Sequence, residues 1–310
     1  MDLITDIGNR TYLIAEYFSD TKVGFQAFFI ASEKSAIIEP GPPLFASKLA
    51  GSLKKLGYDA ASLSYIIPTH IHADHCGGAG NLIQSAPGAR ILAHRQGAKH
   101  LVDIARMERA TRASWSQYYE SEIGNILPVP ESRIELVDDG DTINLGDRVL
   151  TVIYTPGHAK HHICLYDKGS GDLFSGEALG FLLPGDEIKV IPIVSPPVFE
   201  MATALDSINK LRMFKISRIL YSHYGSSQRV EKCLDLAEQG IKTWGDTVLQ
   251  ALRAGRNRAE IKASLAAYLD GQPSASGIFS QLLEWAIDGY TGYFIREGMV
   301  AAGHEQGGSR

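Results

Sequence analysis

Short apolar runs alternate with longer amphipathic stretches over the first 227 residues of this chain. The runs are rich in β-branched and aromatic residues and end at glycine, proline or charged turns, which is typical of buried strands. They lie at residues 11–18, 23–32, 35–43, 63–68, 90–93, 133–137, 142–145, 149–155, 162–167, 172–179 and 218–221. Apolar positions spaced three or four apart predict helices at residues 44–56, 81–85, 95–126 and 199–214. This βαβ order predicts an α/β fold with a mixed sheet covered by helices.

From residue 228 to about residue 300 the pattern is helical throughout, with three segments separated by glycine, Asn257 and Pro273. We therefore predict a domain at residues 1–227, an α-helical region at 228–302 that packs near the active site, and a flexible tail at 303–310. A dimerisation or lid element without substrate contact is the alternative for the helical region. Its aromatic residues suit an apolar pocket or a helical core equally well: Trp244, Phe279, Trp285, Tyr290, Tyr293 and Phe294.

Composition and charge argue against some classes of partner but do not indicate a particular function. The 310 residues are 45% hydrophobic and 21% charged, and the formal net charge is −5. An acidic chain without a basic run does not suggest a nucleic-acid partner. We also expect no membrane partner, because no apolar run approaches the length of a span and the start lacks a signal-peptide pattern. The three cysteines form no CxxC pair, which suits a cytoplasmic location.

The segment HIHADH, residues 70–75, holds four potential metal ligands directly after an apolar run. A loop at the carboxyl end of a strand is where open α/β sheets place their chemistry. His70 and His72 are two apart and can share one metal ion, while Asp74 and His75 can turn to a second one. Packing gives no reason to crowd three imidazoles, whose protonated forms would repel each other. The segment is therefore interpreted as a metal site.

Three further stretches follow predicted strands in the same way: TPGH at 155–158, SGE at 175–177 and SHYG at 222–225. Together with the HxHxDH motif, this order resembles the metallo-β-lactamase superfamily, over roughly residues 10 to 225. The resemblance implies an αβ/βα four-layer sandwich, here with the helical region as a C-terminal appendage. It is specific for fold and metal site and weak for substrate.

The resemblance also implies a ligand set for two divalent metal ions, with zinc as the first choice and iron or manganese as alternatives. His158 would complete a three-histidine site with His70 and His72, and His223 would join Asp74 and His75. Glu177 stands where the family has a bridging Asp. Its extra methylene moves the carboxylate by roughly 1.5 Å, so a bridge between two metals and a contact with one metal both stay open.

Several residues near these motifs carry weaker expectations. The family has an acidic loop where Glu39 stands, so this carboxylate either orients a ligand or is a solvated loop acid. Family members carry a second histidine, near the site but not a primary ligand, at the position of His162. His161 has no such match. His94 has no motif partner and is interpreted as structural, and Tyr224 replaces a glycine of the family pattern.

The resemblance implies a metal-dependent hydrolase of the glyoxalase II-like kind. Zn²⁺ lowers the pKa of a bound water to about 7, so hydroxide is available without a protein nucleophile. Asp74 is the candidate catalytic residue, as a metal ligand that also accepts a hydrogen bond from the nucleophile. We expect a small ester, thioester or lactone as substrate. The alternatives are a mononuclear iron persulfide dioxygenase and a non-catalytic ligand-binding protein with a vestigial site; a homodimer is also open.

Overall fold

The computed structural model describes residues 3–17, 24–183, 187–269 and 277–301. They divide into two compact units that interleave along the sequence. The first unit takes in residues 1–155, 161–176 and 215–228, and the second takes in residues 156–160, 177–214 and 229–310. The flexible tail expected at 303–310 lies outside the described residues, and the domain boundary after residue 227 stays a prediction.

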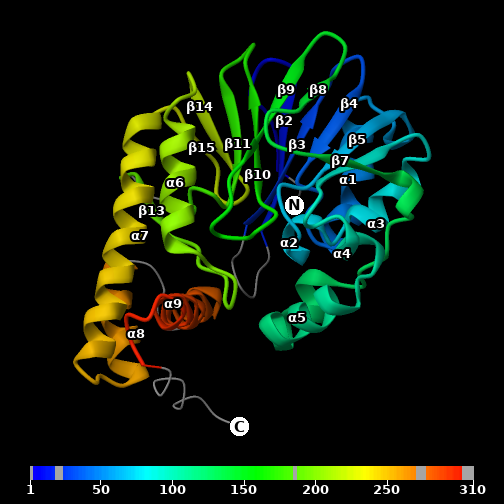
Figure 1. Ribbon diagram of the computed structural model, residues 1–310. Helices are drawn as coiled ribbons and strands as arrows, with labels where there is room; N and C mark the ends of the chain where they lie inside the picture. The colour runs from blue at the N-terminus through cyan, green and yellow to red at the C-terminus, as the bar shows by residue number, and fades with distance from the viewer. Residues whose placement is uncertain (1–2, 18–23, 184–186, 270–276, 302–310) are drawn as a thin grey trace. The chain divides into compact units, whose positions relative to one another are not determined.

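The first unit is built on two β-sheets (Figure 1). The seven-stranded sheet has the order β1 (Leu3–Asp6), β2 (Thr11–Tyr17), β3 (Gly24–Ile30), β4 (Ser35–Ile38), β5 (Leu63–Ile67), β6 (Arg90–His94) and β7 (Ile134–Val137). The six-stranded sheet has the order β15 (Ser226–Ser227), β14 (Arg218–Tyr221), β11 (Asp172–Gly176), β10 (Ile163–Asp167), β9 (Val149–Tyr154) and β8 (Thr142–Asn144). The predicted α/β architecture with mixed sheets is confirmed.

Strand direction sets where the metal motif lies. β4, β5, β6 and β7 run parallel to one another, so their carboxyl ends meet at one edge of the sheet. Ile38, the last residue of β4, pairs with Ile67, the last residue of β5. Glu39 and the HIHADH segment therefore leave the sheet side by side. In the other sheet β11 and β14 are also parallel, with Gly176 opposite Tyr221.

The core of the first unit fills the space between the two sheets. Side chains alternate along each strand, so neighbouring residues face opposite sides. In β4, Ile38 faces the shared core with Phe174 and Leu220 of the other sheet, whereas Ile37 is buried on the opposite face. Packing of Phe29 against Tyr58, with ring centroids 4.8 Å apart, shows that this opposite face is covered as well.

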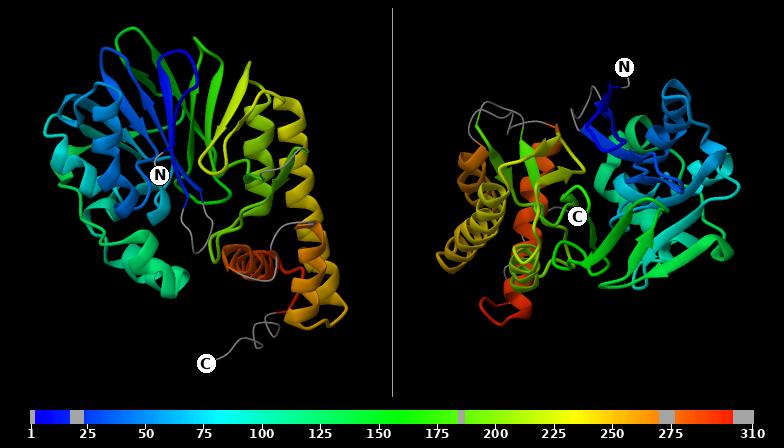
Figure 2. Two further views of the ribbon diagram at one scale, coloured as in Figure 1. Left: turned by 180° about the vertical axis from the view of Figure 1, so that it is seen from behind. Right: turned by 90° about the horizontal axis from the view of Figure 1, so that it is seen from above.

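Helices cover the outer face of the seven-stranded sheet, as the views from behind and above also show (Figure 2). Helix α1 buries Phe45, Leu49 and Leu53 at helical spacing. The helices of this unit are α1 (Pro43–Lys55), α2 (Ala73–Cys76), α3 (Ala79–Leu82), α4 (Lys99–Val102) and α5 (Ala105–Trp115), with short helical turns at Ala60–Ser62, Ile83–Ser85, Ser116–Tyr118, Tyr119–Ile123 and Glu131–Arg133.

The second unit is mainly helical. It contains the hairpin β12 (Phe181–Leu183) and β13 (Lys189–Ile191), then α6 (Met201–Leu211), α7 (Val230–Arg253), α8 (Arg258–Ala266), the turn Ala267–Leu269 and α9 (Gly277–Arg296). The Tyr290 hydroxyl of α9 donates to the Ile241 carbonyl of α7 at 2.8 Å, and both side chains are buried. Most of the six C-terminal aromatic residues are buried. Among the described residues, no helix is both long and apolar enough to cross a bilayer.

Candidate metal centre

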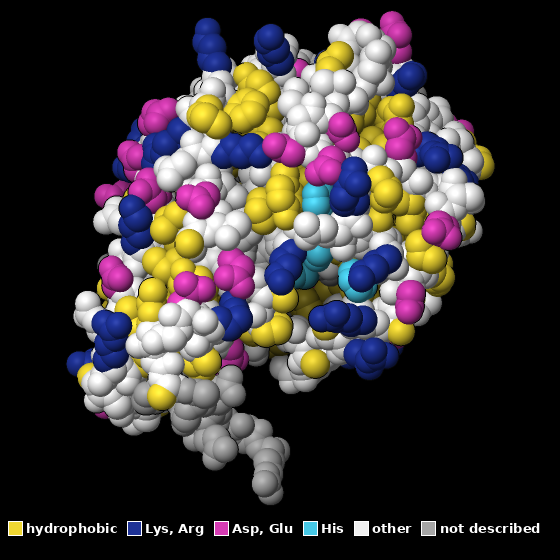
Figure 3. Space-filling model, viewed as in Figure 1, with side chains coloured by type: hydrophobic (Ala, Val, Ile, Leu, Met, Phe, Trp, Pro, Cys, Tyr) yellow, Lys and Arg dark blue, Asp and Glu magenta, His cyan; other side chains and the backbone are white. Residues whose placement is uncertain are grey.

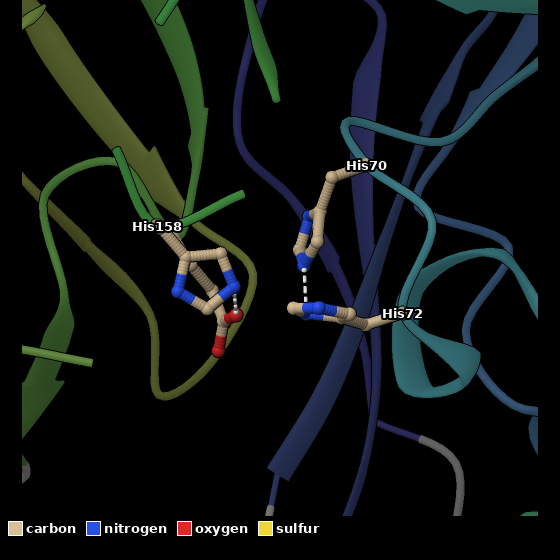
Figure 4. A group of neighbouring side chains, drawn as sticks. His70, His72 and His158 are labelled. Atoms are coloured by element: carbon tan, nitrogen blue, oxygen red, sulfur yellow. Dashed lines mark hydrogen bonds and ion pairs between the residues drawn. The ribbon is translucent and has the colours of Figure 1, made fainter. Parts of the chain in front are cut away.

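The loop after β5 places His70 and His72 against each other. The Nε2 atom of His70 lies 2.9 Å from Nδ1 of His72, and the rings meet edge to face (Figure 4). Nitrogen ligands on one tetrahedral zinc ion lie roughly 3.3 Å apart for Zn–N bonds near 2.05 Å. The two imidazoles therefore approach the spacing that a shared cation requires.

Asp74, His75 and His223 form a second group in the same unit. His75 Nε2 lies 3.4 Å from Asp74 Oδ2 and 3.4 Å from His223 Nε2, and His223 Nε2 lies 4.0 Å from Asp74 Oδ2. Asp74 and His75 come from α2, and His223 follows β14. Since the rings of His70 and His75 are 4.1 Å apart, five of the seven predicted ligands are neighbours within the first unit.

The other ring nitrogen of each histidine in this second group is held by an acceptor. His75 Nδ1 lies 3.0 Å from Glu39 Oε2, and His223 Nδ1 lies 2.8 Å from the Gly24 carbonyl oxygen. An acceptor at Nδ1 assigns the proton to that nitrogen and leaves the Nε2 lone pair for a metal. Both Nε2 atoms are the ones that converge on Asp74, so the tautomers suit metal binding.

The Glu39 carboxylate makes hydrogen bonds to side chains from other segments of the first unit. Its side chain is 2% exposed, and its backbone has a φ of +60°. Beyond His75, the carboxylate accepts hydrogen bonds from the hydroxyl groups of Ser222, at 3.0 Å, and Thr69. Of the two interpretations of Glu39, the structure supports the one in which it orients a ligand.

The remaining two predicted ligands, His158 and Glu177, lie in the second unit. His158, labelled in Figure 4, is buried. Its Nε2 is 2.8 Å from Glu177 Oε2, and its Nδ1 is 3.0 Å from the Ile193 carbonyl oxygen. Gly157 precedes His158 with a φ of +135°, and a Cβ there would come 2.4 Å from the Ala204 backbone. This close approach to α6 explains the glycine of the TPGH segment.

The donor set suits a divalent transition metal. It consists of imidazole nitrogens and carboxylate oxygens, which are ligands for zinc, iron and manganese. Within the first unit, the ligand atoms of Asp74, His75 and His223 all lie within 4.8 Å of one another. The residues present therefore fit a divalent ion of zinc, iron or manganese.

Comparison with known proteins decides the family. The sequence model described as "Metallo-beta-lactamase superfamily" matches residues 26–223, which is more than half of the chain. The chain belongs to the metallo-beta-lactamase superfamily. The match begins within β3 and ends at His223, the last of the predicted ligands. The family predicted from the sequence motifs is therefore confirmed.

The chain is similar to two curated proteins, one named a thioesterase and the other a hydrolase. Acyl-coenzyme A thioesterase MBLAC2 of Homo sapiens is 36% identical over 193 residues, covering 56% of this chain and 64% of that protein. A hydroxyacylglutathione hydrolase of Synechococcus sp. is 32% identical over 127 residues, covering 41% of this chain and 39% of that protein. The chain thus spans less than two thirds of the length of these curated relatives.

Solved structures of the superfamily confirm the predicted αβ/βα fold. TTHA1429 from Thermus thermophilus, a metallo-beta-lactamase family protein, superposes with a TM-score of 0.69 at 19% identity, covering 94% of this chain and 95% of that one. ST1585 from Sulfolobus tokodaii superposes with a TM-score of 0.62, also at 19% identity, covering 94% and 99%.

The structure also places the residues around the motifs. His162 is buried, and its ring centroid lies 5.0 Å from that of His70, near the ligands as expected. His94 stacks on Tyr154 at 4.4 Å, and burial lowers its pKa. Tyr224 adopts a φ of +62°, and burial raises the pKa of its hydroxyl to about 12. Cys76 is buried, with its Sγ 3.4 Å from Met107 Sδ, which fits a packed residue.

His161 is the residue near the site that the sequence motifs did not single out. Its Nδ1 accepts the backbone N–H of Ile71 at 3.2 Å, between the two ligands of the first pair. Its ring centroid lies 6.1 Å from that of His72. The only signal in the sequence is its position beside His162. The close approach arises because the chain returns to the motif loop there, with the Ile163 N–H donating to the Thr69 carbonyl.

Proposed function

We propose that this chain is a metal-dependent hydrolase of thioesters. The convergence of Asp74, His75 and His223, with each imidazole fixed by an acceptor at its Nδ1, is the observation that carries the proposal. The proposed ligands of two divalent cations, with zinc as the first choice, are His70, His72, Asp74, His75, His158, Glu177 and His223. A small ester or lactone is the alternative substrate within the same chemistry.

The segments that carry Glu177 and His158 leave the first unit beside the motif loop. Glu177 is bonded to Gly176, whose φ is +52°. A Cβ on Gly176 would come 2.6 Å from Thr69 Oγ1 and 2.5 Å from His162 Nε2. The chain therefore leaves β11 beside the residue that precedes His70. His158 follows Thr155, which donates its N–H to the His162 carbonyl. Both segments start next to the motif loop.

The relatives support the choice of a thioester. One is named for acyl-coenzyme A and the other for hydroxyacylglutathione, and both compounds join an acyl group to a thiol. A bound divalent cation supplies a water of lowered pKa and polarises a carbonyl oxygen. In this proposal Asp74 accepts a hydrogen bond from the nucleophilic water and orients it toward the acyl carbon. Glu39 keeps the proton of His75 on Nδ1.

The test compares variants of proposed metal ligands with a variant of a histidine that is not a ligand, all purified without chelator. Hydrolysis of an acyl-coenzyme A is followed by thiol release, and metal content is measured by elemental analysis. We expect His72→Ala and Asp74→Asn to lower kcat by about a hundredfold or more, in the range of lost electrostatic stabilisation. His94→Phe keeps the stacking on Tyr154 and should retain both metal and activity. Unchanged turnover in His72→Ala would refute the proposal.

A further inference from the structure

A group of basic side chains lies on α4 and α5, beside the metal ligands of the first unit. Residues 95–112 carry five of the 30 Lys and Arg residues of an otherwise acidic chain, together with two acids. Figure 3 shows Lys and Arg side chains gathered over this part of the surface, with histidine next to them. We call Lys99, His100, Arg106 and Arg109 the basic cluster.

Packing holds this segment at two points, against the motif loop and against α2. Gly97 lies so close to it that a Cβ there would come 2.4 Å from Ile71 Cγ1 and 3.0 Å from His161 Cβ. Farther along the segment, Met107 of α5 contacts Cys76, the residue after the proposed ligand His75. Lys99 comes two residues after Gly97, and Arg106 comes directly before Met107. The basic cluster therefore borders the candidate metal centre.

Three cations of the cluster stand outside the ion pairs of the described residues. Among the described residues, Lys99, Arg106 and Arg109 make no ion pair, and all three are exposed. Arg112 on the same helix differs, because Glu108 and Glu120 bind it at 3.0 to 3.2 Å and it stacks over Tyr119. Burial, and after it the charges of Lys99 and Arg106, lower the pKa of His100 against an opposing effect of Asp103, so both cations act on its ring.

We propose that the basic cluster binds the phosphate groups of a thioester whose thiol portion is a phosphorylated carrier of the coenzyme A type. This inference rests on the proposed thioesterase function and selects the substrate class. Guanidinium groups bind phosphate in a bidentate manner, and several adjacent cations match its multiple charges. The phosphates of such a carrier lie at the far end of its arm from the thioester, so a phosphate site belongs beside the metal centre rather than within it.

The experiment uses three thioesters of one acyl group. They are the coenzyme A thioester, the glutathione thioester, which carries carboxylates only, and the neutral N-acetylcysteamine thioester. The test variant is Lys99→Gln/Arg106→Gln. The matched control, Lys54→Gln/Lys168→Gln, removes the same charge from two exposed lysines of the same unit. All proteins are assayed with metal bound.

We expect the parent to prefer the coenzyme A thioester, and the preference to fall with added salt. The test variant should raise KM for this substrate about tenfold, as for the loss of exposed charge-assisted contacts. Its kcat, and its rate with the neutral thioester, should stay unchanged, and the control should match the parent. An equal loss on all three substrates, or a parent that prefers the glutathione thioester, would overturn the proposal while leaving the thioesterase function intact.

A binding measurement separates this inference from the proposed function. Adenosine 3′,5′-bisphosphate carries the phosphates without a thioester, so calorimetry with the metal-bound protein reports its binding without catalysis. Binding to the parent and control that is at least tenfold weaker in the test variant supports the phosphate site, even if no thioester is hydrolysed. Absence of binding to the parent refutes the site, whatever the enzyme hydrolyses.

Discussion

The Glu39 carboxylate lies 3.0 Å from Nδ1 of His75, and both side chains are almost completely buried. Carboxylates that hold the second nitrogen of a metal-binding histidine fix its orientation and raise its basicity. We therefore predict that Glu39→Gln lowers metal affinity about 10- to 100-fold. Competition with a metal-binding dye measures the affinity. Glu33→Gln, at an exposed position after β3, is the control, and equal affinities in the two variants would contradict the assigned role.

Gly176 leaves no room for a side chain. Its φ is +52°, and a Cβ would come within 2.6 Å of both His162 and Thr69. Gly176→Ala should lower the free energy of unfolding by about 2 to 4 kcal/mol, through backbone strain and steric overlap. Gly57→Ala isolates the backbone contribution, because Gly57 also has a positive φ but has nothing within 4 Å of its Cβ position. Equal destabilisation in urea unfolding would show that packing at Gly176 is unimportant.

An ion pair between the half-buried Arg218 and the buried Asp172 links β14 to β11. The guanidinium donates to both carboxylate oxygens, at 2.7 and 2.8 Å, and to the Ile7 carbonyl. Arg218→Met should destabilise the fold by about 3 kcal/mol, because Asp172 is left buried without a partner. For Arg90→Met, whose contact with Glu135 is exposed and 3.9 Å long, we expect a loss below about 1 kcal/mol. Similar shifts of the two denaturation midpoints would argue against this ranking.

His94 makes stability depend on pH. Burial lowers its pKa below the usual value of 6.5, against a smaller opposing effect of Asp138. As pH falls through 6.5, the unfolded chain takes up a proton at this residue while the folded chain does not, so stability decreases toward acid. His94→Phe should therefore lose less stability than the parent between about pH 7.5 and about pH 5.5. Urea unfolding at both pH values gives the two differences, and identical losses would contradict the prediction.

The sequence predicts most of the fold because its strong signals are long or chemically unusual. The apolar runs of β2 to β6 and the HIHADH segment are of this kind. The strands β1, β12, β13 and β15 were not predicted. β1 has an exposed or half-exposed side chain at every position, and β15 has two residues, so neither carries a hydrophobic pattern. Tertiary pairing, rather than local propensity, makes them strands.

At the candidate site, too, some features are predicted by the sequence and others appear only in the fold. The ligand motifs are visible in the sequence because crowded imidazoles have no packing explanation. The contact of His161 with Ile71 and the clustering of Lys99 with Arg106 depend on how loops return to the motif, which spacing along the chain does not encode. The role of Glu39 is only partly visible in the sequence. Its position matches a family motif, but its contacts with Thr69 and Ser222 are tertiary.

A zinc titration of chelator-stripped protein, followed by thioester hydrolysis, tests the central claim most directly. We predict no hydrolysis without metal and a rise in rate that saturates at two zinc ions per chain. Saturation at one ion would retain the hydrolase and remove the second metal site. Hydrolysis that persists in the stripped protein, or no hydrolysis of any thioester at any metal concentration, would contradict the proposed function.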